Sequence, residues 1–176
     1  MKLKNIFMLM ALTLGASAFV ACGDDDEPTP QDQGTISEAN KAVVGVYEGW
    51  TQLKTAYIPS ETNPGRYAND TFTLALSDGG SLVATFQDAT WGTATITGIQ
   101  ATDENADGLY ELQGGEGSFV MNNIRTGKTE TFSCKLENAV VNPKAHEMSA
   151  VISAYMEVGH GNMTFAFQTG EMPAVD

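Results

Sequence analysis

The chain has 176 residues and a formal net charge of −13, from 9 Lys and Arg against 22 Asp and Glu. This excess of acids argues against a nucleic-acid-binding protein, because such proteins neutralise phosphates with Lys and Arg. The length that remains after an N-terminal leader suits a single domain with its own core.

The first 21 residues have the order of a secretory signal peptide. Lys2 and Lys4 precede an apolar stretch from Ile6 to Leu14, and small residues follow at positions 15–18. The apolar stretch is too short for a spanning helix, which needs about 20 predominantly apolar residues. We predict that residues 1–21 are a lipoprotein signal peptide and take no part in the fold.

Cys22 ends the sequence Phe19-Val20-Ala21-Cys22, which resembles a bacterial lipobox. In such a signal the new N-terminal cysteine carries lipid, and two or more acyl chains hold a protein stably on a bilayer. Cleavage after Ala16-Ser17-Ala18 by an ordinary signal peptidase is the alternative, and it would secrete the protein without an anchor. We predict lipidation of Cys22 and an outer-membrane lipoprotein whose contact with the membrane is this lipid.

An acidic tract follows the cysteine and resembles the tract found in surface-exported lipoproteins of some Gram-negative bacteria. Its residues are Gly23, Asp24, Asp25, Asp26 and Glu27. We therefore expect the protein to be exposed at the cell surface. Residues 22–41 contain two prolines and few large apolar side chains, a composition that cannot bury enough surface to order itself. The sequence predicts a flexible linker over 22–41 and one domain over 42–176.

Alternation of apolar and polar residues predicts strands throughout this domain. The first strand is expected at 43–54, before an irregular stretch at 59–70. Next comes a hairpin around Asp78-Gly79-Gly80, because glycines accept the positive φ angles of tight turns. This hairpin is expected to pair Phe72, Leu74 and Leu76 with Leu82, Ala84 and Phe86.

The later strands follow at short spacings. In the strand at 92–101, Gly98 is expected to mark a bulge that shifts the inward face from Ile96 to Ile99. The remaining strands are expected at 109–113, 118–123, 130–141, 148–156 and 162–169. Such a series implies a sandwich or an up-and-down barrel, and closing the sheet removes its edges. We predict an all-β, antiparallel, up-and-down barrel of about eight strands.

Three motifs in this series resemble the calycin-like β-barrel domain of bacterial lipoproteins, which is similar in architecture to lipocalins. They are Trp91-Gly92 after a strand, a Gly-x-Tyr-x-Leu-x-Gly strand at 108–114, and the hydrophobic strand near the C-terminus. The resemblance covers about residues 42–170. It implies a binding barrel and no set of catalytic residues.

The same alternation predicts which side chains fill the barrel. Bulky inward residues are Phe72, Leu74, Leu76, Leu82, Phe86, Ile96, Leu112, Phe132, Leu136, Ile152, Phe165 and Phe167. Small or flexible inward residues leave room beside them, namely Ala84, Ala94, Cys134, Ala150, Ala154, Met121, Met156 and Met163. We predict a modest apolar pocket toward one barrel end that binds a small hydrophobic molecule. Its expected lining is Ala84, Phe86, Trp91, Ala154, Met156 and Phe165.

Asp103, Asn105 and Asp107 place oxygens at alternate positions, as in a calcium-binding loop. The twelfth position, where such a loop has a bidentate glutamate, is Gly114. A polar hairpin turn is therefore the favoured interpretation. No metal and no cofactor are predicted.

No motif predicts catalysis. His146 and His160 lack neighbours at metal-ligand spacing, and no Gly-x-Ser-x-Gly sequence supplies a nucleophile. Cys134 alternates with polar residues on the apolar face of a strand, which indicates a buried, inert thiol. We expect a protein that is not an enzyme. The alternative to an apolar ligand is a surface glycan or a protein partner, bound by loops and exposed aromatic residues.

Overall fold

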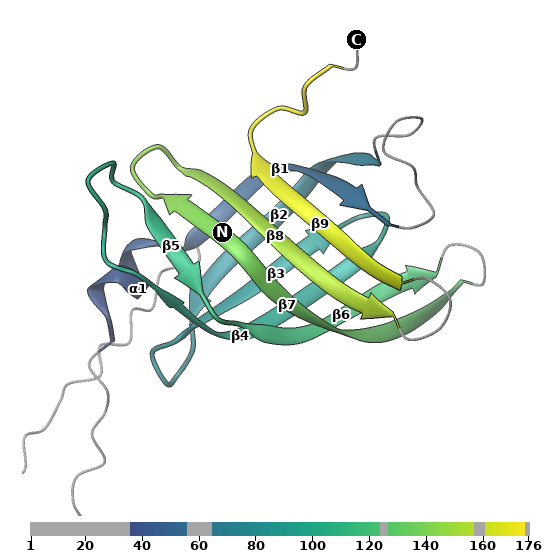
Figure 1. The fold of residues 1–176 in the computed structure, drawn as a ribbon, viewed down its shortest axis with the longest axis horizontal. Helices are drawn as coiled ribbons and strands as arrows, with labels where there is room; N and C mark the ends of the chain where they lie inside the picture. Colours follow the sequence, from purple (N-terminus) through teal and green to yellow (C-terminus); the bar gives the residue numbers. More distant parts are fainter. Residues whose placement is uncertain (1–35, 56–64, 124–126, 157–160, 175–176) are drawn as a thin grey trace, which may run out of the picture. The chain divides into compact units, whose positions relative to one another are not determined.

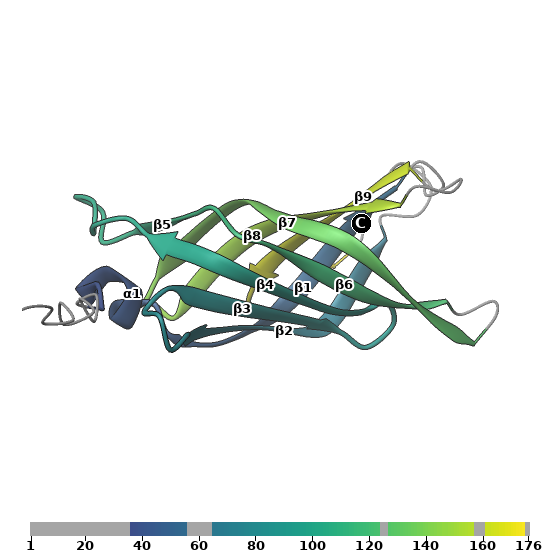
Figure 2. The same cartoon turned by 90° about the horizontal axis from the view of Figure 1, so that it is seen from below.

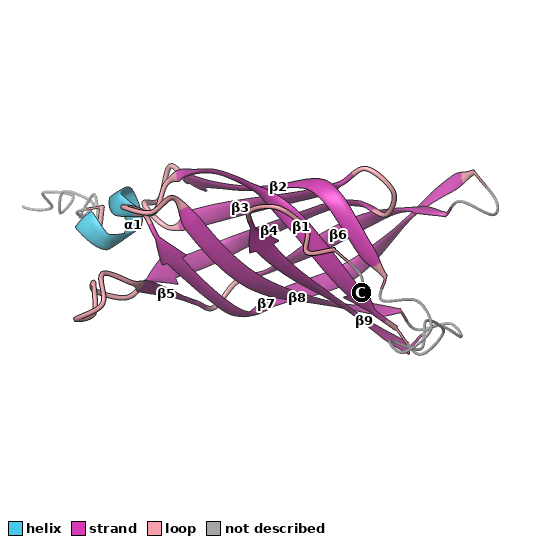
Figure 3. Ribbon diagram, turned by 90° about the horizontal axis from the view of Figure 1, so that it is seen from above, coloured by secondary structure: helices cyan, strands magenta, loops and turns pink. Residues whose placement is uncertain are grey.

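The computed structural model describes residues 36–55, 65–123, 127–156 and 161–174. These residues belong to one compact unit, Gln33–Asp176. Figures 1 and 3 show a short helix followed by antiparallel strands. The elements are α1 (Glu38–Ala42), β1 (Gly45–Lys54), β2 (Arg66–Leu76), β3 (Leu82–Asp88), β4 (Gly92–Ala101), β5 (Tyr110–Gln113), β6 (Glu116–Asn123), β7 (Lys128–Asn142), β8 (Glu147–Met156) and β9 (Gly161–Thr169).

The sheet closes on itself because the first strand pairs with the last. β1 pairs with β2 along one edge and with β9 along the other. The strands β1, β2, β3, β4, β6, β7, β8 and β9 form a closed antiparallel barrel of eight strands, seen from another side in Figure 2. The all-β barrel predicted from the sequence is confirmed.

β5 is an extra strand that lies in line with β6. Thr97 of β4 pairs with Glu116 of β6, and three residues further along β4, Gln100 pairs with Gln113 of β5. The register on β7 continues in the same way. β5 and β6 therefore occupy the same place between β4 and β7.

The β2–β3 hairpin has the predicted register. Phe72 pairs with Phe86, Leu74 with Ala84, and Leu76 with Leu82. The turn between them closes through hydrogen bonds between Ser77 and Ser81, and Gly80 has a φ of 81°. This register also fixes which polar residues face each other further along the two strands.

The bulge predicted at Gly98 is confirmed. Ala84 pairs with Ile96 but Leu82 pairs with Ile99, so β4 carries one extra residue at this point. Gly98 has a φ of 74°, which a side chain rarely allows. As a result, both isoleucines are fully buried.

Phenylalanine rings fill the middle of the barrel. Their centroids lie 4.9 to 6.3 Å apart, the range of favourable aromatic contacts. The five rings are Phe72, Phe86, Phe119, Phe165 and Phe167. At this level the interior is a packed core.

Most of the predicted inward residues are buried, with two exceptions. Leu76 is 36% exposed because it stands at the last position of β2, beyond the core. Phe132 packs against the core but is only half-buried. Of Met156 only the backbone is described.

The structure differs from the prediction at the end of the linker. Residues 38–41 belong to α1, where Ala39 and Asn40 are buried. The Asn40 amide donates to Gly80 O and Gln100 Oε1 and accepts from Ala101 N, each at 2.8 Å. The composition of this segment predicts a flexible linker, but its contacts with the barrel hold it in an ordered helix. The rest of the predicted linker, 22–35, lies outside the described residues.

Two strand boundaries also differ. β1 begins at Gly45 because Val43 ends α1, and β2 begins at Arg66, inside the stretch expected to be irregular. A β-bulge at Asn69, with a φ of 65°, lets this part of β2 stay paired with β1. Among the described residues, no helix is long and apolar enough to cross a membrane.

Candidate binding site at one end of the barrel

The two ends of the barrel differ in what closes them. At one end, here named the α1 end, lie α1, the 77–81 turn and the 102–109 loop. The opposite end, named the Trp91 end, carries the turn at 89–91 between β3 and β4. Polar side chains that the sequence analysis did not single out lie inside the barrel toward the Trp91 end.

These side chains form what we call the buried polar cluster. Thr51 is 0% exposed, Asp70 is 1% exposed and Asp88 is 4% exposed, while Trp91 is half-buried. The three buried residues continue the inward positions of β1, β2 and β3. Polar side chains thus occupy inward positions of these three strands, while Leu53, beyond Thr51 on β1, is apolar and equally buried.

The strand register brings the two aspartates together. Thr71 of β2 pairs with Gln87 of β3, so the next step toward the Trp91 end sets Asp70 opposite Asp88. Such cross-strand neighbours have Cβ atoms about 4.5–5.5 Å apart. In β1, Thr51 lies two residues beyond Gly49, the partner of Asp70.

Several atoms of the buried polar cluster have no hydrogen-bond partner within the part of the chain that the structure describes. They are both carboxyl oxygens of Asp70, Oδ2 of Asp88, Oγ1 of Thr51 and Nε1 of Trp91. In contrast, Oδ1 of Asp88 accepts hydrogen bonds from Thr90 N at 2.7 Å and Trp91 N at 2.8 Å, which hold the β3–β4 turn. Buried polar atoms are nearly always paired, so this group of unpaired atoms marks a place for a ligand or water.

Burial changes the acidity of both aspartates. It raises the pKa of Asp70 from 3.8 to about 7. The nearby Thr51 side chain offsets part of this rise, although its Oγ1 does not meet hydrogen-bond geometry, and the charge of Asp88 raises the pKa further. Burial also raises the pKa of Asp88, against the opposing effect of the backbone hydrogen bonds from Trp91 and Thr90.

An aromatic wall adjoins the cluster. The Phe72–Phe86 pair is the next inward pair beyond the two aspartates, with ring centroids 6.1 Å apart. Phe167 pairs with Thr51 and contacts both of these rings. A few polar groups beside apolar and aromatic walls are the usual composition of a small-molecule site.

The predicted pocket lining coincides with this site only in part. Phe86 borders the cluster, and Trp91 belongs to it and makes an edge contact with Tyr67 at 6.0 Å. Phe165 contacts Phe86 at 5.8 Å and pairs with Leu53, two residues beyond Thr51 on β1. Ala84 and Ala154 are at most 1% exposed within the core, and Ala154 also borders the groove beside Tyr155.

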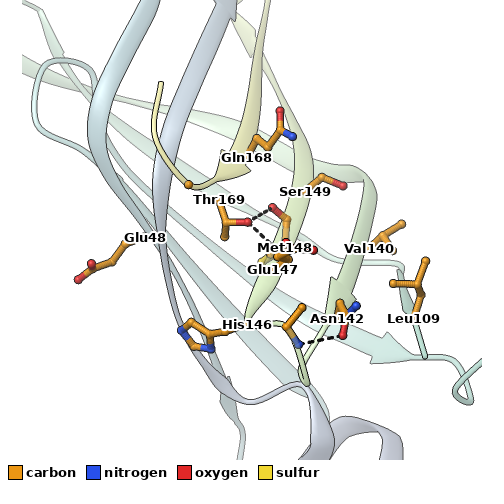
Figure 4. Close-up of a pocket in the computed structure, with 12 residues that line it drawn as sticks. Glu48, Leu109, Val140, Asn142, His146, Glu147, Met148, Ser149, Gln168 and Thr169 are labelled. Carbon is orange, nitrogen blue, oxygen red and sulfur yellow. Dashed lines mark hydrogen bonds between the residues drawn. The ribbon is translucent and has the colours of Figure 1, made fainter. Parts of the chain in front are cut away.

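A second, open groove lies near the α1 end and is drawn in Figure 4. Its walls come from β1, the β7–β8 turn, β8 and β9, and include Glu48, His146 and Ser149. His146 stacks on Tyr47 at 5.0 Å, and within the described residues no hydrogen bond joins it to Ser149. This arrangement lacks an activated serine nucleophile.

A third groove lies on the outer face of β6, β7, β8 and β9. Tyr155 stands there 59% exposed, beside Ser133, Ser153 and Asn162. The side chains of Lys135 and Ser153 both contact Glu137. An exposed aromatic ring among hydroxyl and amide groups can stack on and hydrogen-bond to a sugar.

The weak calcium candidate lies in the 102–109 loop. Asn105 Oδ1 accepts hydrogen bonds from the backbone N of Asp107 and Leu109, and all three candidate side chains, Asp103 included, are exposed. The asparagine thus supports the turn from within. In the part of the chain that the structure describes, no group of three or more His, Cys, Asp or Glu could hold a metal ion.

Cys134 is buried and free, as predicted, and burial raises the pKa of its thiol to about 11. Such a thiol stays protonated and unreactive at neutral pH. Cys22, the acidic tract 23–27 and His160 lie outside the described residues.

Comparison of the chain with protein-family models, with curated proteins and with solved structures finds no significant match.

Proposed function

We propose that the protein is a cell-surface lipoprotein whose calycin-like barrel binds a small, largely apolar ligand without acting on it chemically. The tether is the lipid on Cys22, and the acidic tract 23–27 directs exposure at the surface. The ligand enters at the Trp91 end.

The observation that supports this site is the position of the buried polar cluster beside the aromatic wall. Phe72, Phe86 and Phe167 supply apolar contact, and the unpaired atoms of Thr51 and Asp70 supply hydrogen bonds that fix a ligand's orientation. The centre of the barrel is filled by rings. A ligand bound at one end therefore fits this interior better than one bound at its middle.

Titration with Nile red, a neutral apolar dye, tests the proposal. The sample is the full chain carrying Cys22→Ser, which prevents lipidation. The dye should gain fluorescence when it binds, with a Kd of about 10 µM. Ala154→Phe adds a ring to the interior, so it should weaken dye binding about ten-fold or more. Absence of saturable binding by the unmutated domain would refute the proposal.

Ser149→Phe is the matched control, because Ser149 is on the same strand but points into the outer groove of Figure 4. Dye binding should survive this change. Loss of binding in Ser149→Phe but not in Ala154→Phe would move the site to the outer groove. Circular dichroism should show that both variants remain folded.

The tether is tested separately. Cys22→Ser should abolish lipid labelling and release the protein from the membrane fraction, and an unchanged membrane fraction would contradict lipidation. Replacing residues 24–27 by alanine should leave lipidation intact but hide the protein from protease added to whole cells. Equal digestion of both versions would show that the acids act only as linker.

A second function is favoured by the exposed Tyr155 groove. There the barrel would bind a glycan at the cell surface through Tyr155, Ser133 and Asn162. Tyr155→Ala should then abolish retention on immobilised polysaccharide and leave Nile red binding unchanged. Retention that does not depend on Tyr155 would rule out this groove.

A further inference from the structure

The buried polar cluster holds acidic oxygens that pair with no cation of the described residues. Three carboxyl oxygens are unpaired, two on Asp70 and one on Asp88. The nearby groups that can donate a hydrogen bond are uncharged, namely the Thr51 hydroxyl and the Trp91 indole N–H. Burying a carboxylate is costly unless a positive charge or several hydrogen bonds compensate it.

Several cationic side chains of the described residues contact other groups, although the buried Nε of Arg66 has no hydrogen-bond partner there. Arg66, on the same strand as Asp70, lies over the outward Trp50 ring at 5.8 Å and donates from Nη1 to Pro173 O. Lys135 and Lys144 pair with Glu137 and Glu104 on the outside. Among the described residues, no Lys, Arg or His pairs with either buried carboxyl.

We infer that the ligand at the Trp91 end carries a protonated amine, which binds between the carboxyl groups of Asp70 and Asp88. This inference rests on the proposed function, because it names the class of ligand for that site. An ammonium group has three N–H donors and no acceptor, and it meets three unpaired carboxyl oxygens here. The raised pKa of Asp70, which burial causes, agrees with a carboxyl group that has no counter-charge among the described residues.

The geometry favours an organic cation over a metal ion. Calcium takes six to eight oxygen ligands, whereas the cluster offers two carboxyl groups and one hydroxyl. The wall formed by Phe72, Phe86 and Phe167 contacts the apolar body of a ligand, which a bare ion lacks. The ligand class is therefore a small amphiphilic amine.

Hexylamine and hexanol form a matched pair of probes, since they share the alkyl chain and differ in the head group. Both are titrated into the full chain carrying Cys22→Ser and Trp50→Phe, in which Trp91 is the remaining tryptophan and reports on the site by fluorescence. At about pH 8 the amine is cationic and should bind about ten-fold or more tighter than the alcohol. Equal affinities for the two probes would overturn the inference while leaving the proposed function intact.

Asp70→Asn and Asp88→Asn each remove a charge but keep one acceptor oxygen. In Asp88→Asn this oxygen can still accept the hydrogen bonds from Thr90 N and Trp91 N that hold the β3–β4 turn. Each should weaken hexylamine binding about ten-fold and change hexanol binding little. Asp78→Asn, on the exposed turn at the α1 end, should change neither affinity. An amine preference that persists when both buried aspartates are replaced would contradict the inference.

The outcomes separate the two claims. Binding of hexanol and Nile red without preference for hexylamine retains the binding barrel and shows that the carboxyl groups are satisfied by water or protons. Binding of none of the three probes overturns both the inference and the proposed function. Preference for hexylamine that is lost in the aspartate variants supports both.

Discussion

The two ends of the barrel treat buried polar groups in opposite ways. At the α1 end, Asn40 is 1% exposed and its amide makes three hydrogen bonds. At the Trp91 end, Asp70 is equally buried and its carboxyl makes none. The paired amide contributes to stability at the α1 end, whereas the unpaired carboxyl at the Trp91 end is the basis of the proposed binding site.

The closure of the α1 end explains why a short helix is stable there. α1 has five residues and no side-chain cap, so it cannot persist alone. Asn40 joins it to Gly80 and Ala101, and Tyr47 donates to Val43 O at 2.8 Å. The helix is therefore held in place by its contacts with the barrel at the α1 end.

Asp70 should give the largest effect on stability. Because its pKa in the folded state, about 7, exceeds the usual 3.8, the folded state binds this proton more tightly than the unfolded state. Its contribution to stability is full below about pH 4 and is lost as the pH rises through about 7. Over that interval the free energy of unfolding in urea should fall by roughly 2–4 kcal/mol.

Asp70→Asn stays neutral and should remove most of this pH dependence, so the variant should be more stable than the unmutated chain at about pH 8. The raised pKa of Asp88 acts in the same direction and accounts for what remains. Asp78→Asn serves as the exposed control. An identical pH profile in the unmutated chain and Asp70→Asn would show that the carboxyl is not buried in an uncompensated state.

Asn40→Ala should destabilise the closed end. It removes the hydrogen bonds to the buried Gly80 O and from the partly buried N–H of Ala101, which should lower the free energy of unfolding by about 2–3 kcal/mol. Thermal unfolding measures the loss. Asn138→Ala, at an exposed position of β7, should change stability by less than about 0.5 kcal/mol. Equal effects of the two substitutions would mean that α1 does not close the barrel.

Tyr47→Phe removes one paired hydroxyl at the α1 end. The change deletes the hydrogen bond to Val43 O but keeps the ring, so stability should fall by about 1 kcal/mol. Urea unfolding at neutral pH provides the measurement. No loss would indicate that the hydroxyl bonds equally well to water.

Thr51→Val removes one unpaired hydroxyl at the Trp91 end. Valine has the same shape and lacks the buried unpaired oxygen, so stability should stay the same or rise by about 0.5 kcal/mol. Tyr47→Phe should thus lower the free energy of unfolding, whereas Thr51→Val should leave it unchanged or raise it, and this contrast distinguishes the two barrel ends. A clear loss in Thr51→Val would show that its hydroxyl is paired in solution.

Local rules predicted most of the barrel wall from the sequence. The glycine turn set the β2–β3 register, and the alternation of apolar residues located the later strands to within a few positions. Extending that register two residues from the Phe72–Phe86 pair places Asp70 opposite Asp88, so the sequence held the signal for the carboxyl pair. Alternation of apolar residues does not reveal this pair, because both of its members are polar residues at inward positions.

Two other features depend on tertiary contacts and could not be predicted locally. α1 lies in a polar segment that is ordered by the hydrogen bonds of Asn40 with Gly80 and Ala101. These partners are 40 and 61 positions away in the sequence. The burial of Thr51 depends on closure of the barrel by β9, which sets Phe167 beside it. Neither contact leaves a pattern in the neighbouring sequence.

The pKa of Asp70 can be measured by carbon-13 NMR of its carboxyl carbon. It tests whether Asp70 and Asp88 form an uncompensated carboxyl pair that binds an amine. We expect Asp70 to titrate near pH 7 in the free protein and its pKa to fall toward the usual 3.8 when hexylamine is bound, because a cation stabilises the carboxylate. An Asp70 pKa near 4 in the free protein, or one that hexylamine does not change, would contradict an uncompensated carboxyl pair that serves as a binding site.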